Sequence, residues 1–176
     1  MKNSCEAVSS QGQFNPFARF LMPLFQNSSP RSNGRAILLS IKPKFADQIL
    51  AGSKRVEFRR SWAADGVSMI VLYSSSPIQK IVGVVEVEEV VVASPTSLWK
   101  TCTLRGGGLT REELRLYFAG KSRGVAVLLG RVFKAAKHID PSDVINSFAP
   151  PQSFRYLDVN EYMRIEQKVM RRKEKR

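Results

Sequence analysis

The feature that most constrains the fold is a Val-rich run at residues 81–93, which belongs to a series of apolar runs of strand length. Similar runs lie at residues 36–41, 54–60, 68–73 and 124–133, and helical patterns are fewer. The expected order is strand, helix, strand, strand, strand, helix, strand and a final helix. Because strands dominate and do not alternate regularly with helices, the sequence predicts an α+β fold. We expect a mixed β-barrel of five to six strands with short flanking helices.

Helix boundaries are marked by proline, glycine and capping residues. Pro43 suits the first turn of a helix, and Gly52 suits its end. Thr110 with Glu113, and Asp158 with Glu161, have the spacing of capping boxes. Residues 95–100 are expected to form a single helical turn, residues 106–108 a flexible loop, and residues 149–154 no regular structure.

Charge indicates the class of partner. The chain has 28 Lys and Arg residues against 15 Asp and Glu residues, a net charge of +13 and a pI near 10.2. Such an excess favours a polyanion, most simply nucleic acid. Two distant cysteines, Cys5 and Cys102, and a single His138 predict neither a metal site nor any cofactor. With no membrane-spanning run or signal peptide, we expect a cytoplasmic protein that does not bind membranes. We also expect it to be a monomer.

Three segments are expected along the chain. Residues 1–35 are rich in Ser, Asn, Gln and Pro and predict a disordered or loosely docked arm. Apolar residues within 14–25 have roughly helical spacing, which favours docking on the domain, with contact to a protein partner or a membrane as the weaker alternative. The domain is expected at residues 36–157, followed by a basic helix and tail at 158–176.

A motif at the second predicted strand carries a resemblance to a known family. Residues 52–59 have the pattern G-x-K-x-x-E-x-R, with Lys54, Glu57 and Arg59 at its polar positions. Together with the segments Ile37–Pro43, Leu72–Pro77, Tyr117–Gly120 and Pro150–Leu157, this pattern resembles the ASCH domains, a branch of the PUA-like barrels, in its bacterial and phage-associated members. The resemblance covers residues 36–157. It implies a cleft between the barrel and the first helix that takes RNA or modified nucleosides, and a role in transcriptional regulation.

Candidate site residues cluster around this motif. Gly52 allows a tight turn that brings Lys54 to the mouth of a groove, and Lys54 suits phosphate or a carbonyl. Glu57 and Arg59 lie on one strand face, where they either converge on a ligand or only pair with each other. The other residues expected to bind nucleic acid lie at strand ends, in a later loop or at a basic position: Ser40, Lys42, Tyr73, Ser74, Ser75, Lys80, Gln152 and Ser153. A core position is the equal alternative for Tyr73, and capping of the barrel is the alternative for Gln152 and Ser153.

Three functions follow, in order of preference. The first is a module that binds single-stranded or modified nucleic acid, with RNA favoured over DNA. The second is a hydrolase, either a ribonuclease or an acylcytidine amidohydrolase, with Lys54 and Glu57 as its catalytic residues. The family's small amidohydrolases have Thr in place of Glu57, and a glutamate where this chain has residues 105–108 without a carboxylate. The third is an interaction protein that uses the arm and the basic tail.

Overall fold

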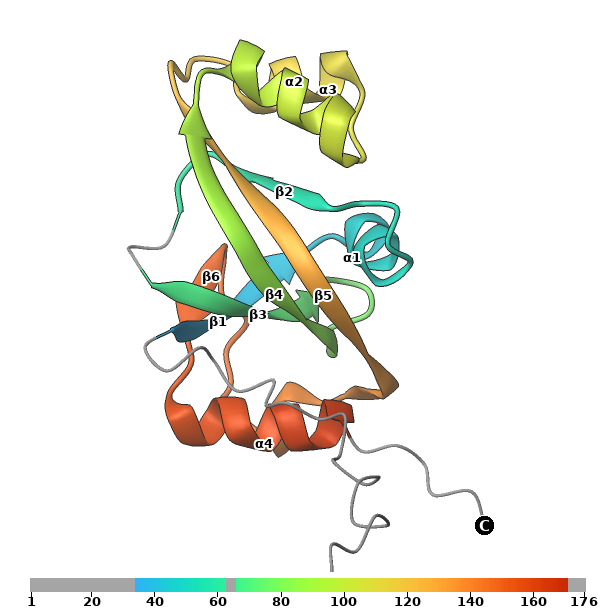
Figure 1. Cartoon of the computed structure of the whole chain (residues 1–176). Helices are drawn as coiled ribbons and strands as arrows, with labels where there is room; N and C mark the ends of the chain where they lie inside the picture. The colour runs from blue at the N-terminus through green and yellow to red at the C-terminus, as the bar shows by residue number, and fades with distance from the viewer. Residues whose placement is uncertain (1–33, 63–65, 171–176) are drawn as a thin grey trace, which may run out of the picture.

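Six strands form one mixed sheet in the computed structural model, which describes residues 34–62 and 66–170 (Figure 1). The strand order is β2-β5-β4-β3-β1-β6, with β1 and β3 parallel and the other neighbours antiparallel. The sheet curls into a half-barrel with β2 and β6 at the ends of this order, and the predicted mixed α+β architecture is confirmed. The strands are β1 (Arg35–Ile41), β2 (Val56–Arg59), β3 (Val67–Ser74), β4 (Lys80–Ala93), β5 (Gly124–Ile139) and β6 (Phe154–Tyr156).

Four α-helices surround the described sheet: α1 (Pro43–Leu50), α2 (Pro95–Arg105), α3 (Arg111–Tyr117) and α4 (Val159–Met170). Figure 1 shows α2 and α3 at one end of the long β4–β5 pair and α4 at the other, with α1 beside the sheet. The predicted start of α1 at Pro43 is confirmed, and Gly52 follows the helix with a positive φ of 77°. Both predicted capping boxes are present, at Thr110–Glu113 and at Asp158–Glu161.

Three boundaries differ from the sequence prediction. The single turn expected at 95–100 is a helix that continues to Arg105, where Gly106 ends it in the left-handed conformation. The strand expected at 124–133 continues to Ile139, because β4 supplies backbone partners along this length. The second strand begins only at Val56, so Lys54 lies on the connection between α1 and β2.

The core consists of three hydrophobic clusters, which involve α4, α1, and α2 with α3 in turn. Leu38, Tyr73 and Ile165 belong to the cluster between the sheet and α4. Ala46 and Ile49 of α1 pack inside the curled sheet. The third cluster joins α2 and α3 to one face of β2, where its buried residues are Val56, Phe58, Leu98, Cys102, Leu114, Phe118, Ala126 and Leu128. Through this third cluster, α3 packs against β2.

Several predictions fall outside the described residues: the arm except for its last two residues, its apolar segment at 14–25, Cys5, and the tail at 171–176. Within residues 34–62 and 66–170, no helix has the length and apolar character needed to cross a membrane.

Candidate functional site

A cavity of about 630 Å³ lies where the ends of β1 and β3, α1, β2 and α3 meet. Its floor carries charged side chains from the motif, and its walls are largely apolar and aromatic. A volume of this size suits a ligand of nucleotide dimensions. The lining residues are Ser40, Ile41, Lys42, Phe45, Lys54, Glu57, Phe58, Arg59, Ser75, Leu109, Glu113, Leu116, Tyr117 and Gln152.

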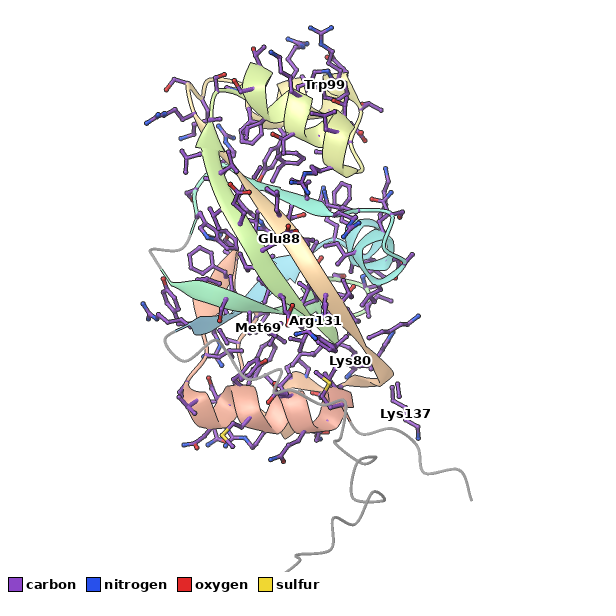
Figure 2. The ribbon with its side chains drawn as sticks, in the orientation of Figure 1. Met69, Lys80, Glu88, Trp99, Arg131 and Lys137 are labelled. Atoms are coloured by element: carbon purple, nitrogen blue, oxygen red, sulfur yellow. The ribbon has the colours of Figure 1, made fainter. Side chains whose placement is uncertain are left out.

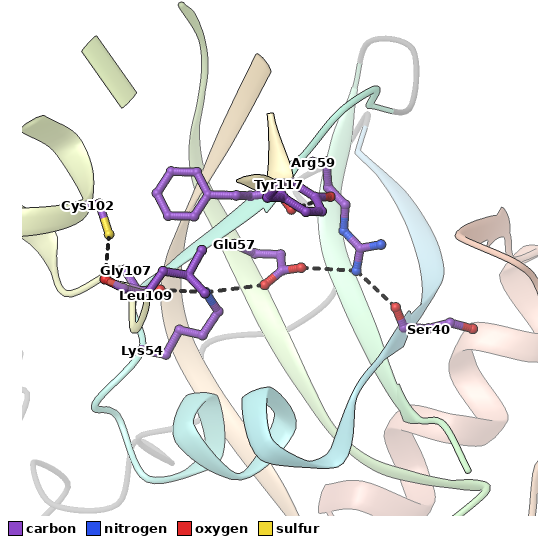
Figure 3. Close-up of polar contacts among 9 residues, drawn as sticks. Ser40, Lys54, Glu57, Arg59, Cys102, Gly107, Leu109 and Tyr117 are labelled. Atoms are coloured by element: carbon purple, nitrogen blue, oxygen red, sulfur yellow. Dashed lines mark hydrogen bonds and ion pairs between the residues drawn. The ribbon is translucent and has the colours of Figure 1, made fainter. Parts of the chain in front are cut away.

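Three charged side chains form a row along the cavity floor (Figure 3). Lys54 Nζ lies 3.5 Å from Glu57 Oε2, and Glu57 Oε1 lies 3.0 Å from Arg59 Nη2. The two β2 residues share a face because strand side chains alternate, while Val56 and Phe58 occupy the other face. Arg59 Nη2 also donates to the carbonyl oxygen of Ser40 at 2.9 Å, which ties β2 to the end of β1.

Lys54 is a buried cation held by several partners. Only 2% of the residue is exposed, and Nζ donates to the carbonyl oxygen of Gly107 at 2.6 Å. The same nitrogen lies 5.2 Å from the centre of the Phe45 ring and 5.5 Å from that of Phe58. Burial lowers the pKa of Lys54, against the opposing effect of Glu57. A group in a cavity whose pKa is shifted by burial and by a charged partner is a candidate for a functional site.

The glycine loop at 106–108 lies directly against Lys54. The carbonyl of Gly106 accepts from Arg55 N at 2.7 Å, next to the carbonyl of Gly107 that holds Nζ. A Cβ at Gly108 would lie 3.4 Å from Lys54 Cβ and 2.8 Å from Gln48 Oε1. A Cβ at Gly107 would overlap Cys102 Sγ. The loop expected to be flexible is thus closely packed, and glycine permits this approach.

Tyr117 supplies an aromatic wall beside the charged row (Figure 3). Its hydroxyl donates to the carbonyl oxygen of Phe58 at 3.2 Å, which fixes the ring relative to β2. Burial raises the pKa of Tyr117, so the hydroxyl stays protonated. The residue is 38% exposed, and therefore its ring can contact a molecule in the cavity.

Seven of the eleven predicted binding residues line this cavity: Ser40, Lys42, Lys54, Glu57, Arg59, Ser75 and Gln152. Ser74 is buried at the end of β3. Ser153 contributes a backbone oxygen, which accepts from Ser40 N at 2.9 Å.

Tyr73 and Lys80 do not join the others in the cavity, contrary to the expectation of a common groove. Alternation along β3 places Tyr73 on the face that packs toward α4, with its ring centre 5.4 Å from that of Phe148. Lys80 pairs with Asp140, and both Tyr73 and Lys80 border a smaller hollow of about 310 Å³. Figure 2 shows Lys80 toward the α4 end of the molecule, away from Trp99 on α2.

The aromatic walls are the part of the site that sequence reasoning misses. Leu114 and Phe118 are buried, whereas Tyr117, next to Phe118 in the sequence, is 38% exposed and lines the cavity. Phe45 and Phe58 also line the cavity, although Phe58 is only 3% exposed and belongs to the core. The sequence alone does not show that these rings share a cavity, because α1, β2 and α3 must first meet in the folded protein. The one available signal is the polar tip of Tyr117, which suits a boundary position.

A carboxylate from α3 reaches the cavity, although none is present at residues 105–108. Glu113 lines the cavity, but its Oε2 accepts from Thr110 N at 2.7 Å and its Oε1 lies 3.8 Å from Lys44 Nζ. These contacts occupy Glu113 in capping its helix. The part of the chain that the structure describes holds no group of three His, Cys, Asp or Glu residues placed to bind a metal ion.

Comparison with known proteins gives consistent results. The family model described as "ASCH domain" matches residues 39–131. A protein of Zymomonas mobilis named "ASCH domain-containing ribonuclease" is 30% identical over 132 residues, which cover 73% of this chain and 88% of that protein.

Solved structures support the same fold. The crystal structure of ASCH from Zymomonas mobilis matches with a TM-score of 0.70 and 28% identity, over 76% of this chain and 94% of that chain. The N-terminal domain of McrB from Staphylothermus marinus matches with a TM-score of 0.51 over 76% of this chain and 94% of that chain. At 13% identity, the second match shows a shared fold alone.

Proposed function

This chain belongs to the ASCH domain family, and from this premise we propose that it binds single-stranded RNA and takes one base into the cavity. The observation that carries the proposal is the row Lys54–Glu57–Arg59 on the floor of a 630 Å³ cavity with aromatic walls. Unstacked bases bind to proteins through polar contacts at their edges and through contact of their faces with aromatic rings.

The charge of the molecule supports the proposal. Exposed Lys42 and Gln152 at the cavity rim are suited to contact phosphate or sugar. The net charge of +13 adds an attraction that does not depend on RNA sequence. RNA is favoured over DNA because the relative from Zymomonas mobilis is named a ribonuclease.

Fluorescence anisotropy with a labelled single-stranded RNA tests the proposal. We expect salt-sensitive binding that weakens at least about tenfold in Lys54→Ala, because the variant removes a buried donor from the floor. Lys137→Ala is the matched control: it removes the same charge from an exposed position on β5 (Figure 2). Its affinity should stay close to that of the wild type.

The proposal fails if the wild-type protein shows no RNA binding at micromolar concentration. A Lys54→Ala variant that folds, as judged by its circular dichroism, and binds RNA as tightly as Lys137→Ala would exclude the cavity as the binding site.

RNA cleavage in the same cavity is the second candidate function, favoured by the lowered pKa of Lys54 and by the name of the Zymomonas relative. A lysine whose pKa is lowered can act as a general base, and the adjacent Glu57 can orient it. The amidohydrolase alternative has less support, because Glu113 is engaged in its capping box.

Incubating labelled RNA with the wild type, Lys54→Ala and Lys137→Ala distinguishes binding from cleavage. Cleavage by the wild type and by Lys137→Ala, but not by Lys54→Ala, supports a ribonuclease. If the RNA stays intact in all three samples and the wild type still binds it, the protein binds RNA without cleaving it.

A further inference from the structure

The charged row presents an ordered pattern of hydrogen-bonding groups to the cavity. Protonated Lys54 and Arg59 can only donate, and a carboxylate such as Glu57 can only accept. Glu57 lies between the two cations, with one oxygen facing each. The floor of the cavity therefore presents a donor, an acceptor and a donor, from Lys54, Glu57 and Arg59 in that order (Figure 3).

Each member of the row keeps capacity for a ligand. Lys54 Nζ has three hydrogens, of which one is donated to Gly107 and another points toward Glu57 at the long distance of 3.5 Å. The two carboxylate oxygens of Glu57 offer about four lone-pair positions in all. Arg59 Nε is buried and has no hydrogen-bond partner among the described residues.

We infer that the cavity selects uracil among the four RNA bases, an inference that rests on the proposed RNA binding. Uracil presents acceptor, donor and acceptor along its O4, N3–H and O2 edge, which complements the row Lys54–Glu57–Arg59. The N3–H donates to the carboxylate of Glu57, and the two carbonyl oxygens accept from the cations on either side.

The other three bases leave a mismatch at Glu57 or beside it. Cytosine and adenine each place a ring nitrogen that accepts, N3 or N1, against the carboxylate, so two acceptors face each other. Guanine places its N1–H there correctly, but its amino group then meets a cation that also donates. A buried polar group left without a partner weakens the binding by much more than a missing contact does. Such mismatches therefore discriminate strongly between bases.

Tyr117 adds a surface for the face of the base but does not discriminate. Its ring lines the cavity beside the row, and stacking on an aromatic ring tolerates every base. The uracil preference is therefore assigned to the polar floor, and overall affinity to the wall and the surrounding charge.

Anisotropy titrations with RNA oligomers of about eight nucleotides test this inference at one salt concentration. We expect oligo-U to bind at least about tenfold more tightly than oligo-C or oligo-A. Oligomers of 3-methyluridine lose this advantage because the methyl group replaces the N3–H. Oligomers of 5-methyluridine keep it because their donor and acceptor edge is unchanged.

Glu57→Gln provides the matched variant. Glutamine offers an amide N–H2 beside its carbonyl, so it can donate to N3 of cytosine, and the ratio of oligo-U to oligo-C affinity should fall toward one. Lys137→Ala should leave the ratio unchanged. If Glu57→Gln does not fold, the methylated oligomers decide the question with the wild-type protein.

The outcomes separate the two proposals. Similar affinity for oligo-U, oligo-C and oligo-A overturns the uracil inference and leaves RNA binding intact. Equal binding of 3-methyluridine and uridine oligomers also overturns it. Failure of every oligomer to bind removes the proposed function itself.

Discussion

At the scale of single residues, Lys54 combines burial with charge in a way that few lysines do. A buried ammonium group loses its hydration, and this loss is offset here by Gly107, Glu57 and two aromatic rings. Because these contacts compensate incompletely, the pKa of Lys54 lies below its ordinary value of 10.5. The site therefore keeps a proton-binding group in an unfavourable environment, as functional sites often do.

The lowered pKa predicts how stability depends on pH. Between the pKa of folded Lys54 and 10.5, the unfolded chain binds the proton and the folded chain does not, so folding becomes more favourable as pH rises. We expect the free energy of unfolding of the wild type to rise through this window relative to Lys54→Met. Urea denaturation at several pH values measures the difference, and a constant difference would contradict the burial of a charged lysine.

Tyr117 is expected to contribute binding through its ring rather than its hydroxyl. Tyr117→Ala should weaken RNA binding by about 1–3 kcal/mol, the usual loss when a stacking ring is removed. Tyr117→Phe should retain most of the affinity, since the hydroxyl bonds to the carbonyl of Phe58 and not to the cavity. Equal losses in both variants, measured by anisotropy, would assign the effect to positioning of β2.

At the scale of elements, the connection between α2 and α3 packs against the side chain of Lys54. Gly106 ends α2, Gly107 accepts from Nζ, and Gly108 lies against the Lys54 side chain. Three consecutive glycines permit an approach that side chains would prevent. The lysine therefore depends on a segment about fifty residues away in sequence.

Gly107→Ala is expected to destabilise the protein by about 1–3 kcal/mol through overpacking. The added Cβ would overlap Cys102 Sγ and lie 2.8 Å from the Phe58 ring. Combining it with Cys102→Ala should recover part of the loss, because the sulfur is removed. Urea denaturation gives the free energies of unfolding.

Gly120→Ala is the control for backbone strain. Gly120 has a φ of +72° and no atom within 4 Å of the added Cβ, so the change should cost only about 1–2 kcal/mol of conformational strain. Cys102→Ala should not lessen this cost. If Gly107→Ala is as stable as the wild type, the loop is not packed as described.

At the scale of the whole molecule, a specific cavity lies within a strongly basic chain. The cavity floor holds two cations and one carboxylate, and most of the net charge of +13 therefore lies elsewhere. We expect the basic residues outside the cavity to give affinity for RNA of any sequence, and the cavity to give selectivity between bases.

Removing residues 171–176 tests this division. The deletion takes away five basic residues and one acidic residue. If some of the basic residues neutralise phosphates, the slope of log affinity against log salt should fall by roughly 0.7 for each phosphate that the shortened protein leaves unneutralised. The preference between oligo-U and oligo-C should stay constant. Anisotropy at several salt concentrations measures both, and a changed base preference would contradict the division.

Local patterns in the sequence determined a large part of the fold. Pro43, the two capping boxes and the alternation along β2 act through neighbouring residues, and the structure confirms each of them. The row Lys54–Glu57–Arg59 could be anticipated for the same reason, since its members are three and two residues apart.

Only the tertiary structure decided what surrounds that row. The Gly107 carbonyl, the Tyr117 ring and the Ser40 carbonyl reach it from separate elements, and the side of β3 on which Tyr73 lies follows from the register of the whole sheet. Such contacts depend on long-range packing, which no short window of sequence encodes. The sequence by itself thus determined the chemical groups at the centre of the site, and the folding of distant segments decided the cavity in which those groups lie.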